Sequence, residues 1–138
     1  MRAEAIFWPV GLLALWTLAV LLQVGFRRFA ATRAGRVQVE AFRLGESPDV
    51  PVDVALPNRN LINLLEVPLL FYVVCLSLYV THQVRLGCLR LAWIYVGLRV
   101  IHTLIHLTTN NVRQRLMVFA LSNFVLVALW IWFLRRVI

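Results

Sequence analysis

Polar residues that could bind or activate a ligand form two short stripes inside otherwise apolar stretches of the sequence. Arg59, Asn63 and Glu66 are spaced by four and three residues, which places them on one face of a helix over about two turns. A second stripe has the same helical spacing and consists of Tyr95, Arg99, His102, His106, Asn110 and Arg113. Because lipid rejects such side chains, we expect both stripes to point into a helix bundle or toward a neighbouring subunit.

The charged members of these stripes are mostly cations. The stripes contain one carboxylate, Glu66, and three arginines, Arg59, Arg99 and Arg113, with Arg115 nearby. A polar cavity with this excess of positive charge suits an anionic ligand, above all a carboxylate, since arginine binds carboxylates through two parallel hydrogen bonds. Arg115 is expected at the beginning of the last helix, where its charge adds to that of the helix N-terminus. A thiol bound there would be pushed toward its thiolate form.

Simpler interpretations of the same residues stay open. Glu66 and Arg99 would form a structural ion pair if the stripes only hold the helices together, with hydrogen bonds between the remaining polar side chains. Arg115 would contact a lipid phosphate if it only marks the membrane interface. Neither alternative accounts for the surplus of cations in the stripes, which favours a ligand site.

The two histidines of the second stripe could be metal ligands. His102 and His106 are one helical turn apart and can chelate an ion, and a haem between subunits is a further alternative. The only other histidine, His82, lies in the loop at the opposite end of the predicted spans, whereas zinc sites use three or four protein ligands. We therefore expect no metal site, and hydrogen-bonding histidines in a polar cleft.

Membrane-spanning helices must position these residues. Of the 138 residues, 62% are hydrophobic and 14% are charged, against about 45–50% and about 25% in soluble domains. A soluble monomer of this size could not bury so much apolar surface, and each helical span needs about 20 mainly apolar residues. The sequence predicts an all-α integral membrane protein with a single domain, residues 1–138, and four transmembrane helices at about 6–26, 60–80, 91–112 and 116–134.

The polar segment 27–59 joins the first two predicted spans. Its beginning, up to about Phe42, could extend the first helix out of the membrane, whereas 47–57 is expected to be an extended loop because of its prolines. Asn58 is the expected N-cap of the second helix. Pro68 lies inside that helix and should bend it, since proline removes a backbone hydrogen bond.

The net charge of +8 comes with fourteen arginines and no lysine. Most of these arginines flank the apolar runs, where anionic headgroups and membrane topology explain them, so we expect no nucleic-acid binding. The side of the predicted bundle that holds segment 27–59 carries eight arginines, and the side that holds the termini carries five. The excess of positive charge predicts that segment 27–59 is cytoplasmic.

The two stripes together resemble the motifs of the MAPEG family, the membrane-associated proteins of eicosanoid and glutathione metabolism. Arg59, Asn63 and Glu66 are similar to the family's Arg-x3-Asn-x2-Glu on its second helix. Residues 99–106 are similar to its Arg-x2-(His or Tyr)-x3-Tyr on the third helix, with histidine in the last position. Arg115 falls where the family places an arginine at the start of its fourth helix.

This resemblance implies a homotrimer that binds glutathione as a cosubstrate between adjacent subunits. Carried over by position, Arg115 would stabilise the glutathione thiolate, Glu66 would bind the ammonium group and arginines would bind the two carboxylates. The residues expected to bind glutathione are Arg33, Arg59, Asn63, Glu66, Arg99, His102, His106 and Arg113.

The function expected from these features is that of a membrane-bound glutathione-dependent transferase or peroxidase. Its expected partners are further copies of the chain, membrane lipids and a lipophilic electrophile. Two functions of other classes are the alternatives: a non-catalytic membrane scaffold, and a small transporter that uses Glu66 as its coupling carboxylate.

Overall fold

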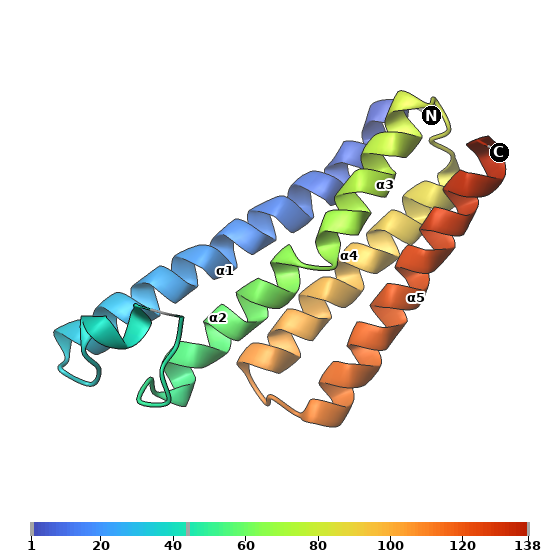
Figure 1. Ribbon diagram of the computed structural model, residues 1–138. Coiled ribbons are helices and arrows are strands. Elements are labelled where there is room, and N and C mark those ends of the chain that lie inside the picture. The colour runs from blue at the N-terminus through green and yellow to red at the C-terminus, as the bar shows by residue number, and fades with distance from the viewer. Residues whose placement is uncertain (1, 44, 138) are drawn as a thin grey trace.

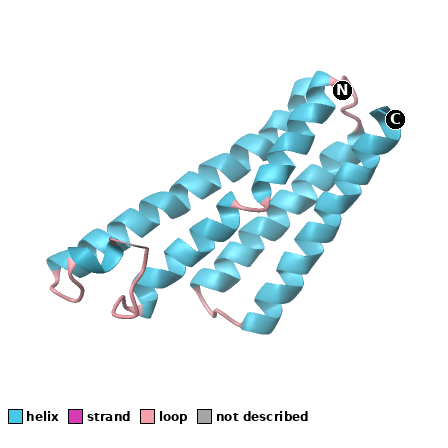
Figure 2. Ribbon diagram, viewed as in Figure 1, coloured by secondary structure: helices cyan, strands magenta, loops and turns pink. Residues whose placement is uncertain are grey.

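The computed structural model of the chain describes residues 2–43 and 45–137. Within these residues every regular element is a helix (Figures 1 and 2), so the predicted all-α class is confirmed. Two short 3-10 helices, η1 (Ala3–Ile6) and η2 (Val39–Phe42), accompany the α-helices α1 (Phe7–Arg33), α2 (Val52–Leu65), α3 (Pro68–Val80), α4 (Leu86–Leu107) and α5 (Val112–Val137).

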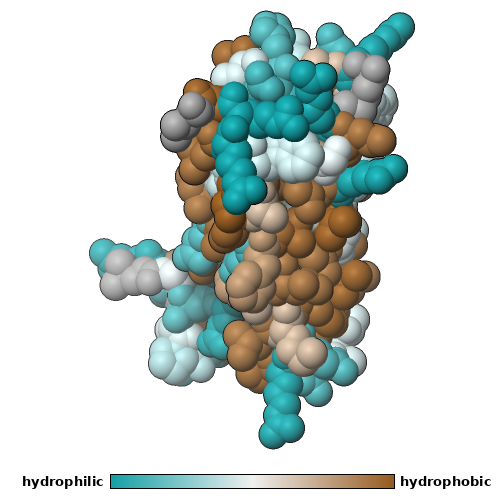
Figure 3. Space-filling model, turned by 90° about the vertical axis from the view of Figure 1, so that its right-hand side faces the viewer, coloured by the Kyte–Doolittle hydropathy of each residue, from teal (hydrophilic) through white to brown (hydrophobic). Residues whose placement is uncertain are grey.

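Four stretches of the described residues are long and apolar enough to cross a bilayer, so the prediction of a four-span membrane protein is confirmed. They are Ala3–Arg33, Val52–Val80, Leu86–Leu107 and Val112–Val137. Only 17% to 39% of the most apolar window of each is buried inside the bundle, so most of the apolar surface faces outward. The space-filling view shows this surface as an apolar band between hydrophilic ends (Figure 3).

The spans run side by side and alternate in direction (Figure 1). Both termini therefore lie at one end of the bundle, together with the turn between α3 and α4. The segment between α1 and α2 and the turn between α4 and α5 lie at the other end. The half of the bundle that faces away from the termini holds most of the polar residues of the two stripes.

The second span is interrupted in its middle. α2 ends at Leu65, and Glu66 leaves the helical conformation with φ −77° and ψ −85°. Pro68, which has no N–H group to donate, then occupies the first turn of α3, where that loss costs least. The predicted bend at Pro68 is confirmed as a complete break, which leaves carbonyl groups of the last turn of α2 without their helical donors.

The expected start of the second span is wrong. α2 begins at Val52, so the extended loop predicted for 47–57 ends at Pro51, and Asn58 lies inside the helix instead of capping it. Pro51 is compatible with this helix because it occupies the N-cap position, whereas Pro57 lies inside the helix and cannot donate the helical hydrogen bond to the carbonyl of Asp53. Proline is tolerated near the beginning of a helix, where few backbone N–H groups have helical acceptors.

Three other helices have boundaries that differ from the expected ones. α1 continues beyond residue 26 as far as Arg33, and stops before Phe42. α4 begins and ends about five residues earlier than the expected 91–112, because the chain leaves the helical conformation at Thr108, and Asn110 then adopts a positive φ of 47°. α5 begins at Val112, so Arg115 lies in its first turns.

The segment between α1 and α2 is folded onto the ends of both helices. Val37 and Val50 from this segment bury their side chains against Ala31 of α1 and against Val54 and Ala55 of α2. This small apolar cluster is separate from the main core of the bundle. It fixes the beginning of α2, and therefore the position of the polar residues further along that helix.

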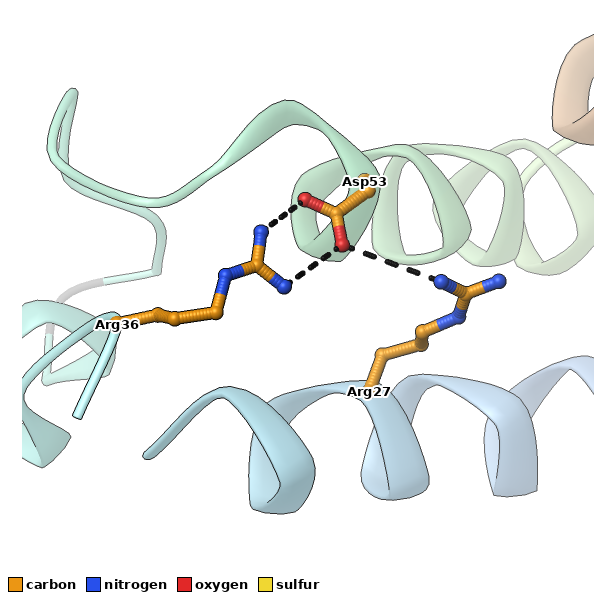
Figure 4. A network of polar contacts seen from close by, with 3 residues as sticks. All are labelled: Arg27, Arg36 and Asp53. Carbon is orange, nitrogen blue, oxygen red and sulfur yellow. Dashed lines mark hydrogen bonds and ion pairs between the residues drawn. The ribbon is translucent and has the colours of Figure 1, made fainter. Parts of the chain in front are cut away.

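Asp53, in the first turn of α2, completes this attachment (Figure 4). Its carboxylate accepts hydrogen bonds of 2.7 and 3.1 Å from the guanidinium of Arg36, and lies 3.9 Å from Arg27 of α1. The hydrogen bond to Asp53 raises the pKa of Arg36 above its ordinary value. Because all three side chains are about half exposed, the network contributes more to the geometry of the segment than to its stability.

Close packing between α4 and α5 requires glycine at one position. A Cβ atom on Gly87 would lie 2.6 Å from the Trp132 ring, so we expect Gly87→Ala to lower the free energy of unfolding by about 1–3 kcal/mol. Nothing lies within 4 Å of a Cβ on Gly97 of the same helix. Gly97→Ala is the matched control and should be neutral or stabilise the protein by about 0.5–1 kcal/mol. Thermal unfolding in detergent compares them, and equal Tm values would contradict the packing argument.

Candidate functional site

A cleft opens between α2, α4 and α5 at the end of the bundle opposite the termini. Its volume is about 220 Å³. One wall is polar and the other is apolar; together they consist of Asn63, His102, Val112, Arg115, Leu116 and Phe119. No acidic side chain lines this cleft among the residues that the structure describes, so its electrostatic character is set by Arg115.

The turn before α5 determines where Arg115 points. The side chain of Asn111 accepts hydrogen bonds from the backbone N–H groups of Arg113 and Gln114, at 3.1 and 3.2 Å, and so caps the helix. Arg115 donates a hydrogen bond of 2.8 Å from Nη1 to Oδ1 of Asn110. The guanidinium is thereby held beside the helix N-terminus, as the sequence predicts.

The stripe on α4 faces the interior of the bundle, as expected. The side chains of Tyr95, Arg99, His102 and His106 are all buried. The rings of the two histidines are 5.8 Å apart, and His102 lies at the same distance from Phe119 of α5. Nδ1 of both histidines is buried and has no hydrogen-bond partner within the described chain, and only the His102 ring lines the cleft.

Arg99 lies directly behind the cleft and is 0% exposed. Its Nη2 donates a hydrogen bond to the backbone carbonyl of Asn63, in the last turn of α2. Its guanidinium carbon lies 5.5 Å from the centre of the Phe119 ring, a distance typical of a cation–π contact. Arg99 therefore connects α4 to both other helices of the cleft.

The stripe on α2 is only partly directed into the bundle. Asn63 lines the cleft, but Arg59 and Glu66 are exposed. The interior position is taken by Asn60, which is 0% exposed and shares hydrogen bonds of 3.3 and 3.4 Å with Thr103 of α4. The stripe is thus rotated relative to α4, so that Asn60, and not Arg59 or Glu66, faces α4.

The ion pair weighed between Glu66 and Arg99 is not formed. The three ion pairs within the described residues all lie in or beside the segment between α1 and α2, and none involves Glu66. Arg99 uses a backbone carbonyl instead. The break at Glu66 turns its carboxylate outward, which the spacing of the stripe could not reveal.

The remaining expected site residues lie around the cleft. Arg113 is exposed in the first turn of α5, and Arg33 is exposed at the end of α1. Arg59 lines a separate hollow of about 380 Å³ with Glu46, against the segment that precedes α2. Of the nine expected residues, a single chain therefore brings together only five: Asn63, Arg99, His102, His106 and Arg115.

Several residues of the cleft were not expected from the sequence. Phe119 contacts both His102 and Arg99, and its position one turn after Arg115 is the only available signal. Asn110 and Asn111 form the turn that holds Arg115. Asn110 is expected as part of the second stripe, but its contact with Arg115 and the capping role of Asn111 are not, although an Asn-Asn pair before an apolar run is typical of a helix start.

Metal ligands are not clustered in this part of the molecule. In residues 2–43 and 45–137, no group of three or more histidine, cysteine, aspartate or glutamate side chains is arranged to hold an ion. Cys75 and Cys88 are both buried and unbridged, in the half of the bundle that holds the termini. The chemistry of the cleft thus depends on arginine, histidine and amide groups.

A four-span helical bundle with a cationic cleft at one end defines a class of small integral membrane proteins. Comparison with family sequence models narrows this class. The model of the MAPEG family matches residues 6–135, and the chain belongs to that family. Comparison with curated proteins and with solved structures gives no match.

Proposed function

We propose that this protein is a glutathione-dependent transferase or peroxidase that acts on lipophilic electrophiles from the membrane. The observation that carries the proposal is the guanidinium of Arg115 in a cleft without acidic lining residues. Membership of a family associated with glutathione chemistry supports it. Arg115 is the proposed catalytic residue because, among the described residues, it is the cationic side chain that lines the cleft.

The electrostatics of the cleft suit thiolate formation. A free thiol has a pKa of about 8.5, so only about 3% is ionised at pH 7. A cation within hydrogen-bonding distance favours the charged form by about 1–3 pKa units. Arg115 near the N-terminus of α5 supplies such a cation, and the released proton passes to water at the open mouth of the cleft.

Glutathione fits the groups around the cleft by charge. Its two carboxylates would be bound by arginines, its ammonium group by Glu66, and its amides by neutral donors and acceptors. The proposed binding residues are Arg33, Arg59, Asn63, Glu66, Arg99, His102, His106 and Arg113. The cleft of about 220 Å³ is smaller than typical ligand pockets of about 300–1,000 Å³.

A neighbouring copy of the chain would complete a site of this size. In a single chain the side chains of Arg59, Glu66 and Arg113 are exposed. All three belong to membrane-spanning stretches, where lipid would reject charged side chains. We therefore propose a homotrimer with glutathione between adjacent subunits. The excess of arginines at this end of the bundle supports a cytoplasmic location for the segment between α1 and α2.

The apolar wall of the cleft suits the second substrate. Val112, Leu116 and Phe119 lie beside Arg115, and the neighbouring surface of α5 is exposed to lipid. A lipophilic electrophile would reach the thiolate from the bilayer. In a transferase reaction the sulfur forms a bond to an electrophilic carbon, whose leaving group departs with the electron pair; in a peroxidase reaction two glutathiones become a disulfide as the hydroperoxide is reduced to an alcohol and water.

Glutathione added to the purified protein in mild detergent should produce an ultraviolet thiolate band near neutral pH and raise the Tm. S-methylglutathione, which keeps the carboxylates and the ammonium group but has no ionisable thiol, is the control and should raise the Tm without the band. Native mass spectrometry of the same sample should show three copies of the 15.9 kDa chain. Absence of both the band and the thermal shift would contradict the proposed function and favour a scaffold.

A further inference from the structure

The turn between α4 and α5 contains the side chain that contacts Arg115. Oδ1 of Asn110 accepts the hydrogen bond of 2.8 Å from Nη1 of Arg115. Asn110 has a φ of 47°, in the left-handed region, and its N–H donates to the carbonyl of Ile105 at 2.7 Å. Asparagine is one of the few residues with a side chain that adopts this conformation readily. One residue thus ends α4 and holds the arginine of the cleft.

The chemical type of this contact matters for Arg115. Aspartate also tolerates the left-handed region, and its carboxylate would form a stronger, charge-assisted hydrogen bond to the guanidinium. That carboxylate would also cancel the positive charge that stabilises a thiolate. The neutral amide of Asn110 orients the guanidinium and leaves its charge available.

Other elements around Arg115 contribute no negative charge. α4 contributes His102 in the lining, with Arg99 and His106 behind it, and α2 contributes the neutral Asn63. Within the described residues, no carboxylate forms an ion pair with Arg115. The polar contact of Arg115 inside one chain is therefore the amide of Asn110.

We propose that Asn110 is a positioning residue that fixes the Arg115 guanidinium beside the thiol without neutralising it. The neighbouring Asn111 assists by capping α5, so that the two asparagines set the start of the helix and the direction of its arginine. This inference rests on the proposed function, because it assigns Asn110 a role through Arg115.

Two substitutions at Asn110 test separately the charge beside Arg115 and the orientation of the Arg115 guanidinium. Asn110→Asp keeps the shape and adds a negative charge, so the apparent pKa of the bound glutathione thiol should rise by about 1–3 units. Asn110→Gly keeps the left-handed backbone and removes Oδ1, so kcat should fall about tenfold, as expected for loss of a hydrogen bond to a charged group, with a smaller change in thiol pKa. The thiolate band is measured against pH, and kcat and KM with a lipophilic electrophile.

His82→Gly is the matched control for the backbone. His82 is the other residue with a side chain and a positive φ, 56°, in the described chain. It lies in the turn between α3 and α4, at the opposite end of the bundle, and its replacement should change neither the thiol pKa nor kcat. Thermal unfolding of all variants checks that each is folded. If Asn110→Gly does not fold, the thiol pKa of Asn110→Asp alone tests the role of Asn110.

The outcomes distinguish this inference from the proposed function. A wild-type thiol pKa in Asn110→Asp, together with loss of the band in Arg115→Ala, would overturn the role of Asn110 and leave the proposed function intact. An unchanged kcat in a folded Asn110→Gly would overturn it as well. An unchanged thiolate band in Arg115→Ala would instead contradict the proposed function.

Discussion

Replacement of Arg115 by alanine is expected to abolish the glutathione thiolate band at neutral pH. It should also lower turnover by about 10²–10³-fold, the loss that follows removal of one group aimed at developing negative charge. Arg115 is the one cationic side chain that lines the cleft among the described residues. Without it, the pKa of the bound thiol returns toward that of a free thiol, about 8.5.

Two further variants make this result specific to Arg115. Arg135→Ala removes an exposed arginine from the last turn of the same helix, at the other end of the bundle, and should leave the band unchanged. Arg115→Lys keeps the charge but loses the planar group that binds Asn110, so a partial band is expected. Normal turnover in a folded Arg115→Ala protein would exclude the catalytic role.

Replacement of Arg99 by methionine is expected to weaken the second span at its break. In an unbroken helix the carbonyl of Asn63 would accept a hydrogen bond from the N–H of Val67, but the helical pattern ends with the bond from Glu66 to Ile62. Arg99 donates to that carbonyl instead. Methionine fills similar space without a donor, so the partly buried carbonyl loses its partner, at a cost of about 1 kcal/mol.

Hydrogen exchange and thermal unfolding in detergent measure this effect. Arg99→Met should speed amide exchange at residues 66, 67 and 69 and lower the Tm, whereas Arg90→Met, on an exposed site of the same helix, should do neither. Buried ion pairs are often replaced by apolar residues without loss. Arg99 differs because its hydrogen-bond acceptor is a backbone carbonyl, which is still present after the substitution. Unchanged exchange at the break would refute this role.

The sequence predicted the α4 part of the site well. Polar residues at helical spacing in an apolar span must share one face, and lipid excludes that face, so burial of Arg99, His102 and His106 follows from periodicity alone. The same reasoning identified the position of Arg115 at the start of the last helix. Length and composition were sufficient for the four spans.

The α2 part could not be predicted in the same way. Periodicity shows which residues share a face but does not show which neighbour covers that face. In the structure, Asn60 occupies the interior position of α2, while Arg59 and Glu66 are exposed. The start of α2 could not be predicted because Pro51 and Pro57 are typical of loops, whereas in the structure Pro51 occupies the N-cap position and Pro57 is accommodated inside the helix. The contact between Asn110 and Arg115 depends on a left-handed turn that spacing does not encode.

The break at Glu66 also bears on how the chain enters the membrane. α2 and α3 contain 14 and 13 residues, which at 1.5 Å per residue gives about 21 and about 20 Å. Neither length crosses a hydrocarbon core of about 30 Å, so the two halves must insert as a pair. The carbonyl of Asn63 at the end of α2 accepts its hydrogen bond from Arg99, which is translated later. We therefore expect the second span to reach its final conformation only after the third span has been made.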